Sequence, residues 1–280
     1  MISDTKLDAL LAEDVPFGDL TTAALGIGAQ EGRISFAARG AMIVCCVEEA
    51  ERLLDQAGAR TRRHTASGNW VEAGTVLLEA DGPAAALHRV WKTAQTLMEY
   101  ASGIASAVGR IVEAAQAVAP AVQVECTRKA FPGTRAIAVR AVHAGGGQMH
   151  RLGLSESILV FPEHLVFLGG GDEALARIAT LKRQHPGRKL TAETGGVDQA
   201  EALARAGIDI VQLERLSPPE ARRVRERTAN LTPRPMIAVA GGVDESNAGS
   251  YAAAGCDILV TSAPYFARPA DVRVRIEAMP

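Results

Sequence analysis

Basic side chains are concentrated in one glycine-containing stretch of the chain, residues 127–151, which reads TRKAFPGTRAIAVRAVHAGGGQMHR. Its basic groups are Arg128, Lys129, Arg135, Arg140, His143, His150 and Arg151. Guanidinium and ammonium groups bind phosphate and carboxylate oxygens through charge-assisted hydrogen bonds. Pro132-Gly133 and the triple glycine at 145–147 interrupt any continuous helix. The stretch therefore favours a binding site for a small polyanion over a solvated helix face.

Two glutamates, Glu193 and Glu214, each follow a predicted strand at an equivalent place. Such a pair of carboxylates suits Mg²⁺, held through water beside a phosphate ligand. The alternative is a structural role, in which they form ion pairs with Arg128, Lys129 or Arg151. Lys129 also suits a Schiff-base lysine, since barrel aldolases use one.

Short turns follow two further predicted strands, at Gly241-Gly242 and at Ser262-Ala263. Loops of this kind in α/β barrels present backbone N–H groups to a phosphate. The alternative is a pair of ordinary tight turns.

The elements that must position these groups alternate along the chain after residue 121. The predicted strands are 122–126, 157–161, 189–192, 208–213, 236–239 and 258–260, and the predicted helices are 172–184, 198–206, 218–229 and 244–254. This alternation indicates a parallel sheet covered by helices. Polar residues after several strands favour an α/β barrel with its site at the carboxyl ends, although a doubly wound open sheet also fits.

The first hundred residues predict a small α+β domain. Helical patterns at 85–101 and 104–119 are separated by Ser102-Gly103, where we place the domain boundary. Cys45 and Cys46 lie in an apolar run and are expected to pack as small hydrophobic residues. The four cysteines show neither zinc-ligand spacing nor a disulfide framework.

The composition argues against several classes of protein. The net charge of −2 at pH 7 disfavours non-specific binding to nucleic acid or to membrane surfaces. No stretch approaches the ~20 apolar residues of a membrane span, and the amino terminus lacks a signal-like apolar region. We expect a cytoplasmic protein.

The stretch TRKAFPGTRAIAVRAVHAGGGQMHRLGL resembles the signature of the quinolinate phosphoribosyltransferase family. Supporting motifs follow in order and spacing: EDVPFGDLTT at 13–22, SGIAS at 102–106, ERLSPPEA at 214–221 and AGGVDESN at 240–247. The resemblance implies a type II phosphoribosyltransferase. It has an N-terminal α/β sandwich (1–103), on which 267–280 packs, and an incomplete, seven-stranded α/β barrel (104–266). The family forms homodimers with shared active sites. It joins phosphoribosyl pyrophosphate to a pyridine dicarboxylate with Mg²⁺, releasing pyrophosphate and carbon dioxide.

The resemblance also assigns roles by position. Lys129, Glu193 and Glu214 match catalytic positions, and the two glutamates would hold Mg²⁺ through water. The family has Asp where Glu214 stands, and an Arg lent to the partner subunit where Lys92 stands. The expected substrate-binding residues are Lys92, Thr127, Arg128, His150, Arg151, Phe161, Gly241, Gly242, Ser262 and Ala263.

Two family lysines are absent, because Phe161 and Val139 stand in their places. Lys92 also loses the bidentate geometry of an arginine. Each lost charge-assisted bond is worth about 1.5–3 kcal/mol, so a dianionic pyridine acid is disfavoured. This pattern resembles the ModD branch of the family, which is associated with molybdate-transport genes.

We therefore expect phosphoribosyl transfer to a different heteroaromatic acceptor. The alternatives are a true quinolinate phosphoribosyltransferase of NAD biosynthesis, a non-catalytic binding protein for a small oxyanion linked to molybdate uptake, and a Schiff-base lyase.

Overall fold

The computed structural model describes residues 2–169 and 171–280, without the side chains of residues 171, 172 and 174. The chain divides into two compact units. Unit 1 contains residues 1–109, 131–146 and 264–280, and unit 2 contains residues 110–130 and 147–263. Residues 131–146, which the sequence places in the barrel domain, group instead with unit 1.

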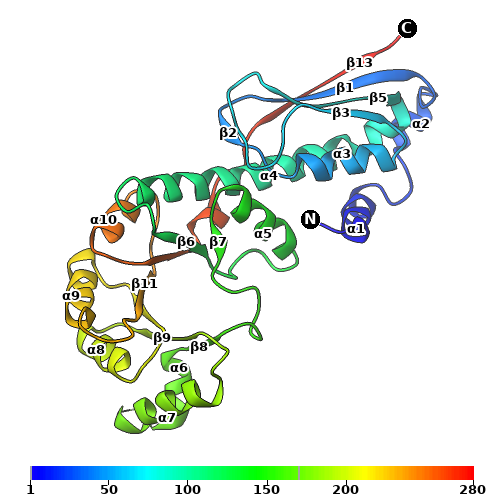
Figure 1. The fold of residues 1–280 in the computed structure, drawn as a ribbon. Helices are drawn as coiled ribbons and strands as arrows, with labels where there is room; N and C mark the ends of the chain where they lie inside the picture. Colours follow the sequence, from blue (N-terminus) through cyan, green and yellow to red (C-terminus); the bar gives the residue numbers. More distant parts are fainter. Residues whose placement is uncertain (1, 170) are drawn as a thin grey trace. The chain divides into compact units, whose positions relative to one another are not determined.

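Unit 1 is built on an antiparallel sheet with the strand order β13-β1-β5-β3. The bounds are β1 (Glu31–Ala38), β3 (Arg60–Arg63), β5 (Val76–Pro83) and β13 (Val272–Ala278). In β1, alternation buries Ile34 and Phe36 completely. Helix α3 (Val47–Gln56) and the part of α4 (Ala84–Gln116) that belongs to unit 1 run along the sheet, as Figure 1 shows. The remaining elements are α1 (Asp4–Asp14), α2 (Leu20–Ala24), β2 (Met42–Ile43), β4 (Trp70–Val71), α5 (Arg135–Ala144) and η2 (Ala263–Phe266).

Helix α4 is continuous, so the predicted break at Ser102-Gly103 is wrong. Gly103 forms no turn, and its missing side chain lets another segment of the backbone pack closely against α4. A Cβ at Gly103 would overlap the backbone carbonyl oxygen of Arg268 and lie 3.0 Å from the Cα of Pro269. Ser102 also has a local role, because its hydroxyl accepts the N–H of Cys45 at 2.8 Å.

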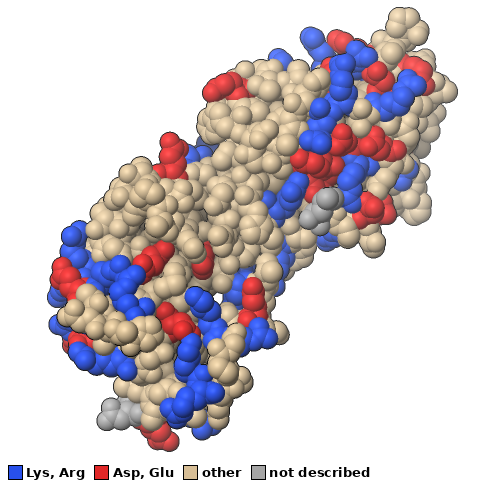
Figure 2. Space-filling view, viewed as in Figure 1, with Lys and Arg blue, Asp and Glu red and all other residues tan. Residues whose placement is uncertain are grey.

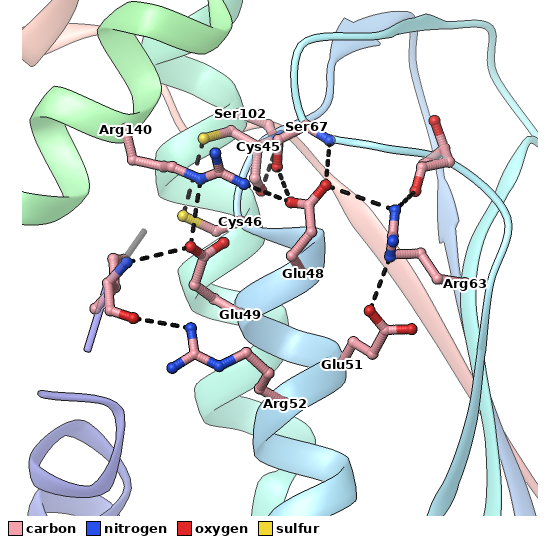
Figure 3. A network of polar contacts seen from close by, with 12 residues as sticks. Cys45, Cys46, Glu48, Glu49, Glu51, Arg52, Arg63, Ser67, Ser102 and Arg140 are labelled. Carbon is pink, nitrogen blue, oxygen red and sulfur yellow. Dashed lines mark hydrogen bonds and ion pairs between the residues drawn. The ribbon is translucent and has the colours of Figure 1, made fainter. Parts of the chain in front are cut away.

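A buried polar network joins α3 to α5 inside unit 1 (Figure 3). Arg140 of α5 donates to Glu48 at 2.8 Å and lies 3.3 Å from Glu49, whose side chain is fully buried. Glu48 also accepts the N–H of Ser67 at 2.9 Å. Arg140 therefore stabilises unit 1 through internal ion pairs. Cys45 and Cys46 are buried free thiols beside this network, as expected.

Unit 2 contains a seven-stranded parallel sheet with the order β7-β6-β12-β11-β10-β9-β8, which confirms the incomplete barrel. The strands are β6 (Gln123–Cys126), β7 (Gln148–Met149), β8 (Ile158–Val160), β9 (Leu190–Thr194), β10 (Ile210–Glu214), β11 (Met236–Ala240) and β12 (Ile258–Thr261). The other elements are α6 (Pro162–Leu165), η1 (Val166–Leu168), α7 (Gly171–Gln184), α8 (Val197–Arg205), α9 (Pro218–Thr228) and α10 (Ala248–Ala253). Figure 1 shows α8, α9 and α10 outside the sheet.

Strand alternation decides which side chains face the inside of this sheet. Val211 and Leu213 of β10 pack in the outer core beneath the helices, whereas Ile210 belongs to a small inner cluster with Ala238 and Ile258. Because alternate residues share a face, the two polar residues of β10, at positions 212 and 214, face inward. The same alternation in β9 directs residue 193 inward.

The sequence Ala-Gly-x-Asp-Ile occurs twice, at 206–210 and at 254–258. In each copy the glycine follows a helix with a positive φ, 85° at Gly207 and 87° at Gly255. Each aspartate then accepts a backbone N–H from the neighbouring strand, Asp209 from Leu190 and Asp257 from Ile237, both at 2.8 Å. The repeated motif fixes strand register at the amino ends of the strands, away from the carboxyl ends where barrel sites lie.

No helix in the described part of the chain is long and apolar enough to cross a membrane. On the face seen in Figure 2, basic and acidic side chains are interspersed and form no continuous basic patch.

Candidate active site

Thr127 connects two neighbouring strand ends in unit 2. It follows β6, and its hydroxyl shares a hydrogen bond of 2.6 Å with the hydroxyl of Ser262, which follows β12. The same Thr127 oxygen accepts the N–H of Lys129 at 3.2 Å. Thr127 therefore shapes the turn that carries the exposed Lys129 side chain.

Two carboxylates and an amide lie at the ends of β9 and β10. Gln212 donates to Glu193 through an N–O distance of 2.6 Å, and it is 3% exposed. Burial raises the pKa of Glu193, and the negative charges of Glu214 and Glu163 raise it further. The hydrogen bond from Gln212 and the positive charge of Lys129 act in the opposite direction. A pKa that is shifted by burial together with nearby charges is typical of functional sites.

The glycine loop after β11 lies against Glu214. Gly241 has a φ of 87°, and a Cβ there would lie 2.8 Å from the Glu214 carboxylate. Gly242 has a φ of 92° with open space at its Cβ position. Within residues 2–169 and 171–280, neither of their N–H groups has a protein acceptor. The side-chain amide of Asn247 donates a hydrogen bond to the Gly242 carbonyl oxygen at 2.8 Å. The loop can therefore donate to an anion.

Ser262 and Ala263 use their polar groups within the protein. The Ser262 hydroxyl bonds to Thr127, and the Ala263 N–H donates to the Thr261 hydroxyl at 3.0 Å. The Ala263 N–H is therefore satisfied internally, whereas the sequence suggested that this loop offers its N–H groups to phosphate.

A second group of polar residues lies where the two edge strands end. Arg151 follows β7 and is 8% exposed, and its guanidinium lies 5.9 Å from the ring centre of Phe161, which follows β8. Burial, followed by the charge of Arg128, lowers the pKa of Arg151. Neither arginine forms an ion pair with an acid among the residues that the structure describes. Two neighbouring guanidinium groups without acids suit an anionic ligand.

His150 pairs with Glu125 on the same side of unit 2. Its Nδ1 lies 2.6 Å from Glu125 Oε2, and both side chains are largely buried. The nearby His164 has a local role, because its Nδ1 accepts the N–H of Phe161 at 2.9 Å and its ring stacks on Phe161.

The remaining predicted positions lie in unit 1. Lys92 is exposed on α4, where its ammonium donates to Gln95 at 3.2 Å and lies 4.4 Å over the Trp91 ring. Arg135, Arg140 and His143 lie on α5. The run of basic residues at 127–151 is thus divided between the two units.

The donor set fits Mg²⁺ only together with a ligand. Within the described part of the chain, no cluster of three or more His, Cys, Asp or Glu residues could bind a metal. Glu193 and Glu214 repel one another electrostatically, and a divalent cation would relieve that repulsion. Mg²⁺ commonly binds through one or two carboxylates and substrate phosphates, so the pair fits.

Sequence reasoning missed Gln212 and Glu125. Both lie inside predicted strands, at the alternate positions that face the interior. A polar residue at such a position in an otherwise apolar strand was the available signal.

Comparison with known proteins identifies the class. The chain belongs to the quinolinate phosphoribosyl transferase family, whose C-terminal domain matches residues 104–275 and whose N-terminal domain matches residues 19–102. It is therefore an enzyme of the phosphoribosyltransferase class, with a phosphoribosyl pyrophosphate-type donor and a small acceptor.

Relatives of this chain include proteins named "Putative pyrophosphorylase ModD". That of Rhodobacter capsulatus is 49% identical over 250 residues, covering 89% of this chain and 95% of the relative. That of Pasteurella multocida (strain Pm70) is 38% identical over 275 residues, covering 98% of each. The structure of NadC from Streptococcus pyogenes shares the fold, with a TM-score of 0.89, 24% identity, and coverage of 99% of this chain and 97% of that one.

Proposed function

We propose that this enzyme transfers the phosphoribosyl group of phosphoribosyl pyrophosphate to a ring nitrogen of a heteroaromatic acceptor other than quinolinate, with release of pyrophosphate. The observation that carries the proposal is electrostatic. The charges of Lys129 and Glu214 both affect the pKa of Glu193, which supports a single site formed by one cation and two carboxylates from three strand ends. Gly241, whose N–H has no protein acceptor among the described residues, adjoins the carboxylate of Glu214.

The donor side of the site would act by charge. The N–H groups of Gly241 and Gly242 would hold the ribose phosphate, and Lys129 would neutralise the diphosphate as it leaves. Glu193 and Glu214 would stabilise the positive charge that develops at the anomeric carbon. The same two carboxylates would hold Mg²⁺ through water. When bound, the cation would further neutralise the charge of the leaving group.

The acceptor side would orient the nucleophilic ring. Arg128 and Arg151 would bind an acidic group, and Phe161 offers a flat apolar surface where the family has a lysine. The loss of that cation supports a ligand other than a dianionic pyridine acid. We further propose a homodimer in which Lys92 of a second copy completes each site.

Isothermal titration with phosphoribosyl pyrophosphate and Mg²⁺ tests the donor half of the proposal, and binding at millimolar ligand or below is expected. A pyrophosphate-release assay over a panel of pyridine and purine acids tests the acceptor half. We expect turnover with at least one acid, weak turnover of quinolinate, and loss of product in Lys129→Ala.

Three results would contradict the proposal. Absent binding of phosphoribosyl pyrophosphate would remove the donor role. Efficient use of quinolinate would make the protein a quinolinate phosphoribosyltransferase of NAD biosynthesis. Binding without product from any acid would support the non-catalytic alternative.

A further inference from the structure

Glu125 is an inward-facing acid that the proposed reaction does not use. Its only ion-pair partner in the described part of the chain is His150, at 2.6 Å, and the two side chains are 14% and 12% exposed. The neighbouring cations, Arg128 and Arg151, do not pair with it. Glu125 therefore contacts the imidazole of His150, the residue that directly precedes Arg151 in the chain.

The hydrogen bond fixes the arrangement of the imidazole. When Glu125 is ionised, its carboxylate only accepts hydrogen bonds, and Nδ1 of His150 then carries a proton and donates to it. Nε2 is then the nitrogen available to a ligand. It accepts a hydrogen bond when the ring is neutral and donates one when the ring is protonated.

The pair also sets the charge of the pocket. The summed charge of Glu125 and His150 is −1 with a neutral imidazole and 0 with a protonated one, whereas His150 alone would contribute 0 or +1. An ionised Glu125 thus lowers the net charge around His150 by one unit in either state of the imidazole. Because Phe161 is uncharged, the fixed cations that one copy of the chain supplies to the acceptor side are Arg128 and Arg151.

We propose that Glu125 is a specificity-determining residue that restricts the acceptor to a flat heteroaromatic ring with a single acidic group. This inference rests on the proposed function and refines it. The acidic group binds Arg151 and Arg128, the ring lies against Phe161, and His150 Nε2 bonds to a neutral polar atom. A second carboxylate near His150 would meet the charge of Glu125, and such like-charge contacts are strongly unfavourable.

The test compares two acids that share one ring, pyridine-3-carboxylate and pyridine-2,3-dicarboxylate. Glu125→Gln removes the charge and keeps an oxygen that accepts from His150 Nδ1. Glu226→Gln, an exposed position on α9, is the matched control. For each variant we would measure the Kd of both acids by titration calorimetry and kcat/KM by pyrophosphate release.

We expect the wild type and Glu226→Gln to prefer the monoacid. In Glu125→Gln the ratio of the two Kd values should shift towards the diacid by about tenfold or more, as expected for removal of a close like charge. Partial unfolding lowers the amount of competent protein but leaves this ratio unchanged, so the ratio separates specificity from stability.

An unchanged ratio in Glu125→Gln, or no binding of either acid by any variant, overturns the inference. If the Kd ratio shifts as expected but no acid yields pyrophosphate, the role of Glu125 in selection stands and the proposed reaction fails. The two claims can therefore fail separately.

Discussion

Glu193 is a residue of the candidate site whose pKa is raised in the folded protein. Burial and then the charges of Glu214 and Glu163 raise its pKa above the usual 4.5, against the opposing effects of Gln212 and Lys129. The folded protein therefore binds more protons at this group than the unfolded chain does, between the two pKa values. The contribution of Glu193 to stability falls as the pH rises through that window.

Glu193→Gln should consequently raise the free energy of unfolding at pH 7.5, because it removes an ionised group that the fold disfavours. The gain should shrink as the pH is lowered towards 4.5, the ordinary pKa of a glutamate. Urea denaturation at several pH values measures both effects. A gain that is the same at every pH would show that ionisation of Glu193 is not its source.

We expect Gln212 to act on the proposed reaction through Glu193, because its side-chain amide donates to that carboxylate. Gln212→Met removes the 2.6 Å hydrogen bond, which helps to keep Glu193 ionised. Hydrogen bonds to charged groups are worth about 1.5–3 kcal/mol, so we expect kcat to fall about tenfold or more. The acidic limb of the pH–rate profile should move to higher pH.

Gln123→Met, at an exposed position on β6, is the control and should leave the profile unchanged. A loss of activity in Gln212→Met that is equal at all pH values would assign Gln212 a packing role instead.

At the scale of elements, α4 shows how tertiary contact overrides a local signal. Replacing a glycine inside a helix by alanine ordinarily stabilises the helix by about 1 kcal/mol. At Gly103 the added methyl would overlap the backbone at Arg268 and crowd Pro269. We expect Gly103→Ala to lower the free energy of unfolding by about 1–3 kcal/mol, as overpacking does.

Gly109→Ala in the same helix is the matched comparison, because its methyl would meet the terminal Cδ1 of the Ile43 side chain, which can rotate away. Urea denaturation should show a smaller loss there. Equal or greater destabilisation by Gly109→Ala would argue against backbone overlap as the reason for Gly103.

At the scale of the whole molecule, the proposed homodimer predicts complementation. Lys92→Ala and Lys129→Ala would each be inactive alone if each site uses Lys92 from one copy and Lys129 from the other. Dissociating and reassociating an equal mixture should restore about a quarter of wild-type activity, because half of the dimers are mixed and each has one intact site.

Light scattering on the same mixture reports the oligomeric state. No recovery of activity from a verified mixed dimer would place both lysines in one copy's site, and full activity of Lys92→Ala alone would remove Lys92 from the site.

The sequence by itself determined the class of fold and the strand ends that carry the site. Alternation of apolar strands with amphipathic helices is a local pattern, and polar residues such as Glu193 and Glu214 lie at the carboxyl ends of the strands. The family motifs add the expected reaction.

Tertiary structure decided which of these side chains share a site, because partners depend on strand order and register. The first strand of unit 2, β6, pairs with the last, β12, and so brings Thr127 to Ser262. Arg140 lies in the same basic run as Lys129, yet it folds into unit 1 and pairs with Glu48 and Glu49. Glu125 and Gln212 meet their partners, His150 and Glu193, only because strand pairing places each pair side by side, which no spacing along the chain encodes.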